Sequence, residues 1–190
     1  MQGLKTGVLA LALVTGAAAA VEPELGAENF LSEVNNNTHL GGPYAQRYAQ
    51  VFELHDTGEL SHLMLPIACD SWITLVAMIE EAPAGIPNGN VLASQAVPGY
   101  VLDAAQWSNV TAAMRMVEFT RPALLPPGRY AFTLGVKGKG SCGLWRAPQG
   151  SPYAHYAYRR ASNLPAGWQL LHDGSGNPQH LAFQVFQRPQ

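Results

Sequence analysis

Apolar and polar side chains alternate along many short segments of this chain, and no long amphipathic helix is apparent after residue 45. Alternation at every second position is typical of strands that bury one face. The clearest examples span residues 48–54, 60–68, 72–80, 91–97, 114–119, 129–136 and 181–186. About ten such strands separated by Gly- and Pro-containing turns predict an all-β fold, a two-sheet antiparallel β-sandwich of jelly-roll type.

Two strands show the pattern with particular clarity. In the first, Tyr48, Gln50, Phe52 and Leu54 are expected to share one face. In the second, the turn 126–128 is followed by Tyr130, Phe132 and Leu134 at alternate positions. Pro127 presets φ for a tight turn, and Gly128 is expected to adopt a positive φ there. We expect Tyr130 to lie in the core.

The chain divides into three parts. Residues 1–20 combine Lys5, an apolar run over 7–14 and small residues at 17–20, which is the layout of a secretory signal peptide. The run is too short to span a membrane, and the alternative is an uncleaved N-terminal helix or anchor. Residues 21–45 are weakly patterned and are expected to form an arm or linker, and the alternative is that part of this range packs as an edge strand. Residues 46–187 are expected to form the sandwich domain.

Charge and cysteine content narrow the functional classes. The chain has 11 basic and 13 acidic residues, which gives a net charge of −2. It has no block of basic residues, so it lacks the positively charged surface expected of a nucleic-acid binder. Its two cysteines, Cys69 and Cys142, predict a disulfide after export. The alternative is a pair of buried thiols. Neither cysteine has a second one nearby, so no zinc-binding spacing is present.

The order of several short segments resembles exported bacterial jelly-roll modules, similar to carbohydrate-binding modules and discoidin-like domains. The resemblance covers roughly residues 46–187 and rests on Ala49–Phe52, Ile79–Glu81, Gly85–Ala93, Leu125–Tyr130, Gly167–Trp168 and Leu181–Phe186. It implies a sandwich fold and a non-catalytic role, and it transfers no binding residue.

Catalysis finds little support in the sequence. No Gly-x-Ser-x-Gly turn is present. Glu80 and Glu81 are adjacent on a strand, so they point to opposite faces and do not form a glycosidase pair. We expect them to lie at a solvated strand end. The protein is therefore predicted not to be an enzyme, and a cleft with converging polar side chains would revive that alternative.

One loop could hold a structural Ca²⁺ ion. Asp103, Asp173 and Asn177 are conceivable ligands, since Ca²⁺ prefers carboxylate and carbonyl oxygens. The alternative is an exposed polar loop without a metal. We expect no other cofactor.

Aromatic and basic residues gather late in the chain. Rings can stack on the faces of sugars, and Arg and His can hydrogen-bond sugar hydroxyls. The candidate ligand-binding residues are Trp145, Arg146, Tyr153, His155, Tyr156 and Arg159. The alternative is that these aromatics fill the core. Trp72 and Trp107 are assigned to core and loop packing.

The sequence therefore predicts a secreted, periplasmic or cell-surface binding module whose ligand is a glycan or another surface molecule. It predicts no stable membrane span after signal cleavage. The alternative is a structural protein of a cell envelope or virion, which would self-associate through residues 21–44 or through strand edges.

Overall fold

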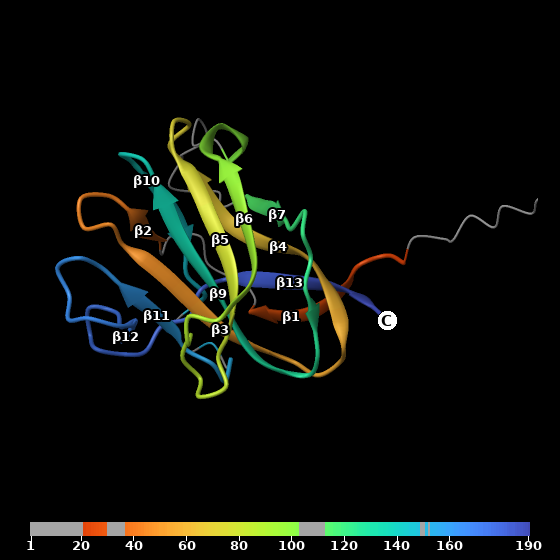
Figure 1. Cartoon of the computed structure of the whole chain (residues 1–190). Coiled ribbons are helices and arrows are strands. Elements are labelled where there is room, and N and C mark those ends of the chain that lie inside the picture. The colour runs from red at the N-terminus through yellow and green to blue at the C-terminus, as the bar shows by residue number, and fades with distance from the viewer. Residues whose placement is uncertain (1–20, 30–36, 103–112, 149–150, 152) are drawn as a thin grey trace, which may run out of the picture.

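Two antiparallel β-sheets pack face to face in the computed structural model of this chain (Figure 1). The structure describes residues 21–29, 37–102, 113–148, 151 and 153–190. These residues form thirteen strands and one short 3-10 helix, η1 (Gly99–Leu102). The prediction of an all-β sandwich is confirmed. The signal peptide predicted at 1–20 lies outside the described residues, as does Trp107.

One sheet has seven strands, with β4 as its longest member. Its strands are β1 (Glu24–Asn29), β13 (Phe183–Pro189), β4 (Gly58–Cys69), β10 (Ser141–Trp145), β2 (Asn37–Gly41), β7 (Met114–Glu118) and β8 (Leu124–Leu125). On β4, β13 pairs along residues 58–64 and β10 along residues 67–69. Strands β7 and β8 also pair with β4.

The other sheet has six strands and faces the viewer in Figure 1. In order, they are β12 (Gln169–Leu170), β11 (Ala157–Arg160), β3 (Arg47–Leu54), β9 (Gly128–Lys137), β5 (Thr74–Glu81) and β6 (Val91–Pro98). Strand β11 therefore pairs with β3, which brings the late part of the chain against its first long strand.

Side chains from both sheets fill the space between them. Phe52 and Phe132 come from the six-stranded sheet, and Phe183 comes from the seven-stranded sheet. The ring centroids of Phe132 and Phe183 are 5.2 Å apart, and those of Phe52 and Phe183 are 6.3 Å apart. Tyr130 is 6% exposed and packs against Phe52, which confirms its predicted place in the core.

The structure corrects the role expected for residues 21–45. Strand β1 pairs with β13, and β2 pairs with β10, so both are part of the seven-stranded sheet. The sequence pattern is weak here because β2 contributes Gly41 and polar side chains, while backbone hydrogen bonds hold it in place. The described parts of this range, 21–29 and 37–45, therefore contain two edge strands, in line with the alternative expectation, rather than a free arm.

The disulfide between Cys69 and Cys142 is confirmed. The two residues are cross-strand partners on β4 and β10, and both are fully buried. Within the described part of the chain, no helix is long and apolar enough to cross a membrane.

Two turn residues differ from the predictions. Gly128 does not adopt a positive φ, because β9 already begins there and Gly128 pairs with Leu54. Trp72 is 71% exposed rather than packed in the core. It precedes β5 in a turn, and its indole N–H donates to the Lys139 carbonyl at 2.8 Å.

Glu80 also differs from the prediction of a solvated strand end, since it is only 5% exposed. Its carboxylate accepts hydrogen bonds from Thr133 Oγ1 at 2.8 Å and from the Gly89 amide at 3.0 Å. Glu80 thus ties the β5–β6 loop to the outer face of the six-stranded sheet. These two donors satisfy the hydrogen-bonding needs of the buried carboxylate.

Candidate functional site

The six predicted ligand-binding residues fall into two groups. Arg146 and Arg159 act electrostatically on the buried Tyr48, and Trp145 precedes Arg146 at the end of β10. Arg159 is the cross-strand partner of Tyr48. Burial raises the pKa of Tyr48, while its hydrogen bond with Thr38 and the charges of Arg159 and Arg146 lower it. Both arginines therefore favour the ionised form of the Tyr48 hydroxyl.

Trp145 is 3% exposed. It ends β10, which lies between β4 and β2 in the seven-stranded sheet. A ring this deeply buried presents no free face for a sugar to stack on. Trp145 is therefore a packing aromatic, which was the alternative, and not part of a ligand-binding surface.

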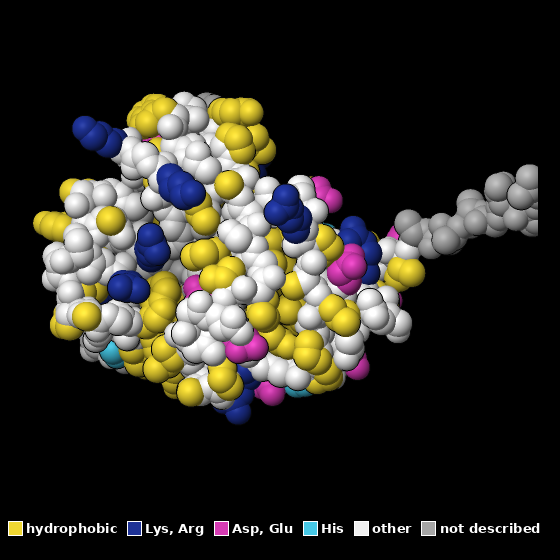
Figure 2. Space-filling view, viewed as in Figure 1, with side chains coloured by type: hydrophobic (Ala, Val, Ile, Leu, Met, Phe, Trp, Pro, Cys, Tyr) yellow, Lys and Arg dark blue, Asp and Glu magenta, His cyan; other side chains and the backbone are white. Residues whose placement is uncertain are grey.

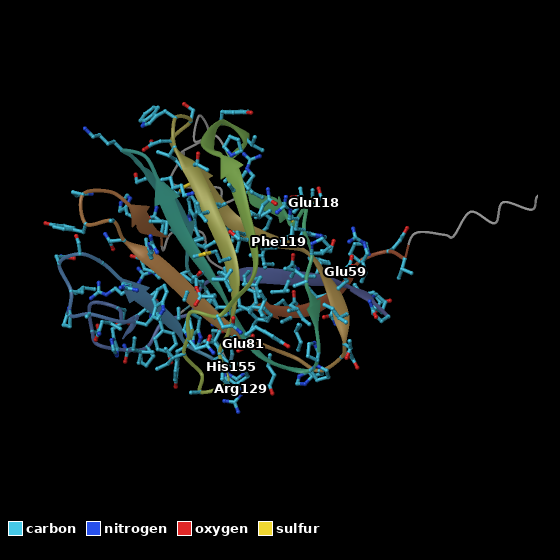
Figure 3. All side chains as sticks on the ribbon, viewed as in Figure 1. Glu59, Glu81, Glu118, Phe119, Arg129 and His155 are labelled. Carbon is cyan, nitrogen blue, oxygen red and sulfur yellow. A yellow bond between two sulfur atoms is a disulfide. The ribbon has the colours of Figure 1, made fainter. Side chains whose placement is uncertain are left out.

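The other three predicted residues, Tyr153, His155 and Tyr156, lie together. His155 Nε2 is 3.1 Å from Glu53 Oε2 on β3. The ring centroids of Tyr156 and His180 are 5.4 Å apart, and Tyr153 contacts the rings of both His155 and His180 edge-on. We call these five residues the tyrosine–histidine cluster. Figure 3 shows His155 at the same end of the sandwich as Arg129, the cross-strand partner of Glu53.

A buried glutamine holds this cluster against the sheet. Gln50 on β3 points inward, as predicted, and is fully buried. Its Nε2 donates to the His155 carbonyl at 2.7 Å and to the Val51 carbonyl at 2.9 Å. Its Oε1 accepts from the Leu181 amide at 2.8 Å. Gln50 therefore joins β3, the 153–156 segment and the residues just before β13.

The two tyrosines of the cluster have different roles. Tyr153 packs its ring on Phe183 at 5.4 Å, and burial raises the pKa of its hydroxyl, so it stays neutral. Tyr156 is 44% exposed. Tyr156 is thus the ring of this cluster that a ligand can reach.

A shallow groove of about 290 Å³ lies beside the cluster. It is lined by Gly26, Ala27, Glu28, Glu53, His55, Tyr153, Ala154 and His155. The His155–Glu53 pair is on its wall. Ser151, the nearby hydroxyl residue, donates its Oγ–H to Asn29 Oδ1 at 2.7 Å. The contact between the His155 imidazole and the Glu53 carboxylate therefore holds the 153–156 segment against β3.

Beyond Tyr156, the outer face of the six-stranded sheet carries a second aromatic ring. Tyr158 on β11 packs over Val51, Ala82 and Ala131 and remains half-buried. Burial raises the pKa of Tyr158, and the charge of an ionised Tyr156 raises it further. Tyr156 and Tyr158 form a pair that we call the tyrosine track.

The sequence did not single out Glu53 or Gln50, and it did not place His180 in this cluster, because their roles depend on contacts between distant segments. Gln50 is 105 residues from His155, and Glu53 is 102 residues from it. The sequence offered a signal for Gln50 alone, because this polar residue lies on the otherwise apolar side of a strand.

Two of the three Ca²⁺ ligands considered above, Asp173 and Asn177, lie together in one turn. Asp173 Oδ1 accepts from the Ser175 and Asn177 amides at 2.8 Å each, and its Oδ2 accepts from Asn177 Nδ2 at 3.1 Å. These bonds lower the pKa of Asp173 and close a polar turn. Asp103 lies outside the described residues, and no group of three or more His, Cys, Asp or Glu residues that could hold a metal is found within them.

His180 makes the stability of the cluster depend on pH. Its Nδ1 lies 2.9 Å from the His155 carbonyl, an acceptor, so this nitrogen carries the proton. Burial lowers the pKa of His180, although the bond to His155 partly raises it. A folded-state pKa below the unfolded value means that the unfolded chain binds protons first as the pH falls.

We therefore expect the free energy of unfolding to decrease as the pH falls from about 7.5 through 6.5 and on through the folded pKa of His180. His62 adds to the decrease, because burial also lowers its pKa. Urea unfolding at a series of pH values measures the slope. His180→Gln should flatten it, whereas His172→Gln, at an exposed site, should not. Equal slopes in both variants would contradict the assignment.

Comparisons with known proteins add little beyond the fold. No protein-family model matches the chain, and no curated protein matches it. Among solved structures, it is similar to a family two carbohydrate esterase from Cellvibrio japonicus, with a TM-score of 0.31 and 11% sequence identity. That match covers 79% of this chain and 34% of the esterase chain, so the chain spans about a third of the esterase's length.

Proposed function

We propose that the protein is an exported, non-catalytic module that binds carbohydrate on the outer face of its six-stranded sheet. The observation that carries the proposal is the tyrosine track. Tyr156 exposes 44% of its surface, and Tyr158 lies two positions further along the chain, on β11. Such rings offer flat faces for the C–H groups of sugars.

The surroundings of the track suit a sugar ligand. Both rings are held by packing, Tyr156 against His180 and Tyr158 against Val51 and Ala131. Rings that packing already holds in one orientation lose little conformational entropy on binding. Glu53 has a half-exposed carboxylate beside Tyr156's neighbour His155, and it can accept hydrogen bonds from hydroxyl groups.

Export is supported by the disulfide. Disulfides persist in oxidising compartments such as the periplasm and the extracellular space. The Cys69–Cys142 bond, together with the signal-like pattern at residues 1–20, favours a secreted or periplasmic protein.

The alternative role, as a structural protein that self-associates, stays a prediction. Truncation of residues 21–44 would remove β1 and β2 from the seven-stranded sheet. Such a variant would report on folding as well as on self-association, so sedimentation of the full chain is the better measurement.

The carbohydrate proposal is tested by binding to a glycan array and by titration of the best oligosaccharide found there. We expect Tyr156→Ala to weaken that binding about tenfold, since a stacked ring contributes on the order of 1 kcal/mol. Tyr156→Phe keeps the ring and should bind nearly as well as the wild type.

The matched control is Tyr100→Ala in η1, because Tyr100 is 67% exposed and lies outside the proposed surface. It should leave binding unchanged. An array without hits, or equal affinities for Tyr156→Ala and wild type, would count against the proposal.

A further inference from the structure

We propose that the carbohydrate ligand is acidic, and that Arg47 and Arg160 bind its carboxylate or sulfate groups. The inference rests on the proposed function, because it names the class of ligand for the same sheet face. It combines Arg160, which belongs to the late aromatic and basic stretch, with Arg47 of β3, which the sequence did not indicate.

The first observation is the register of β3 and β11. Arg47 and Arg160 are direct cross-strand partners, and both are exposed. Like charges placed directly opposite each other on neighbouring strands destabilise a sheet. Within the described residues, neither guanidinium forms an ion pair with a carboxylate. A bound anion would relieve this repulsion.

The second observation is the position of the Arg47 side chain. A Cβ atom built on Gly135 of β9 would lie 3.5 Å from Arg47 Nε and 3.6 Å from its Cγ. The side chain of Arg47 therefore lies across Gly135, on the outer face of the sheet. The missing side chain at Gly135 gives it the room to do so.

The third observation is a groove of about 420 Å³ that both arginines line. Its other lining residues are uncharged: Ala45, Ala161, Ser162, Leu164, Pro165 and Ala166. The Ser162 amide and hydroxyl both donate to the Tyr44 carbonyl, at 2.8 and 3.0 Å, so the two walls are bonded to each other. The groove is thus preformed, with two positive charges and no acidic side chain in its lining.

Ala45, on one wall, has a φ of 47°, a left-handed conformation that is unfavourable for a residue with a Cβ. Such strain is often found at ligand sites. Guanidinium groups can bind carboxylate or sulfate through two parallel hydrogen bonds, which suits this pair to an acidic group of a sugar.

The fourth observation connects the groove to the tyrosine track. Tyr158 and Arg160 occupy alternate positions of β11, so they lie on the same side of the strand about 7 Å apart, and Tyr156 comes directly before the strand. Figure 2 shows Lys and Arg side chains along the left part of this face. A polysaccharide chain could place sugar rings on the tyrosines and an acidic group between the arginines.

The overall charge favours a specific site over general attraction to polyanions. The net charge of the chain is −2, and a negative protein repels polyanions at long range. Binding to an acidic glycan would therefore depend on the local arginine pair.

The experiment compares matched probes on a glycan array. Oligosaccharides that contain uronate or sulfate are paired with neutral counterparts of the same linkage. The full chain should bind acidic probes at least about tenfold more tightly than their neutral partners, and raising the salt concentration should reduce the difference. A single-stranded oligonucleotide serves as an anionic probe that is not a sugar.

The double variant Arg47→Gln/Arg160→Gln should lose the preference for acidic probes. Its melting temperature without ligand should be equal to or higher than that of the wild type, because a repulsive pair has been removed. Arg121→Gln removes an exposed charge elsewhere and should retain the preference. This melting measurement separates a binding role from a structural one.

The outcomes distinguish this inference from the proposed function. Tyr156-dependent binding of neutral probes as tight as that of their acidic partners, or an acidic preference that survives the double variant, would overturn the acidic-ligand inference and leave carbohydrate binding in place. Equally tight binding of the oligonucleotide would overturn specificity for a glycan. An array without any hit would overturn both proposals.

Discussion

Replacing both half-cystines, as Cys69→Ala/Cys142→Ala, is expected to lower the free energy of unfolding by about 4 kcal/mol. The bond joins residues 73 positions apart, so it removes a large loop-closure entropy from the unfolded chain. For a chain of this size, the loss corresponds to a decrease in melting temperature of roughly 10 °C.

The measurement is urea unfolding of the double variant beside wild-type protein with and without a reducing agent. Reduced wild type should resemble the double variant, because both lack the same cross-link. Both should also show a larger dependence on urea, since an unfolded chain without the bond exposes more surface. If oxidised and reduced protein unfold at the same urea concentration, the bond does not support the fold in this way.

The disulfide also joins the end of β4 to the neighbouring strand β10. Cys69 ends β4, and Cys142 pairs with it from β10. Next to this point, the Ser141 amide donates to Asp70 Oδ2 at 2.8 Å, and the Asp70 amide donates to the Ser141 carbonyl at 3.0 Å. Loss of the cross-link should therefore first be felt at this end of the sandwich.

The strands of the core could be predicted from the sequence because their pattern is local. Tyr130, Phe132 and Leu134 alternate, and the structure buries all three. The same reasoning placed Gln50 on the inner face, although it could not say what a buried amide would bind. Alternation identifies a face, and only tertiary contacts identify a partner.

The predictions that failed concern residues next to strands. Trp72 was counted as the first residue of a strand, but β5 begins at Thr74 and the indole lies on the Lys139 turn. Glu80 was expected in solvent, but the 82–90 loop returns to hydrogen-bond it. Hydrophobic periodicity carries no information on where a loop folds back.

The candidate site was predicted in part for the same reason. The late aromatic segment was correctly read as rich in rings, yet Trp145 is buried and Tyr156 is exposed. Arg47 could not be linked to Arg160 from the sequence, because they are cross-strand partners through the β3–β11 pairing. Registers between distant strands require the fold.

Gln50→Leu is expected to lower the free energy of unfolding by about 3 kcal/mol. Leucine fills a similar volume, but the Leu181 amide loses its acceptor and the Val51 and His155 carbonyls lose a donor. Leaving a buried polar group unpaired costs about 1–3 kcal/mol, and each lost bond adds a smaller amount. The His155 carbonyl keeps its bond to His180, which limits the loss.

Chemical unfolding measures this change, and amide hydrogen exchange shows where it acts. Exchange should become faster at Leu181 and along residues 153–156, while the interior of β5 and β9 should change only with global stability. Because the same segment positions Tyr156, the variant should also bind carbohydrate more weakly than its folded fraction alone explains.

The matched control is Gln179→Leu. Gln179 is 2% exposed, and within the described residues its Oε1 has no hydrogen-bond partner, while its Nε2 makes one long bond of 3.5 Å to Pro178. Replacing such a glutamine removes little and relieves an unpaired buried atom, so stability should change by less than about 1 kcal/mol. Equal losses in the two variants would mean that burial of the side chain, rather than the three hydrogen bonds of Gln50, determines the stability at this position.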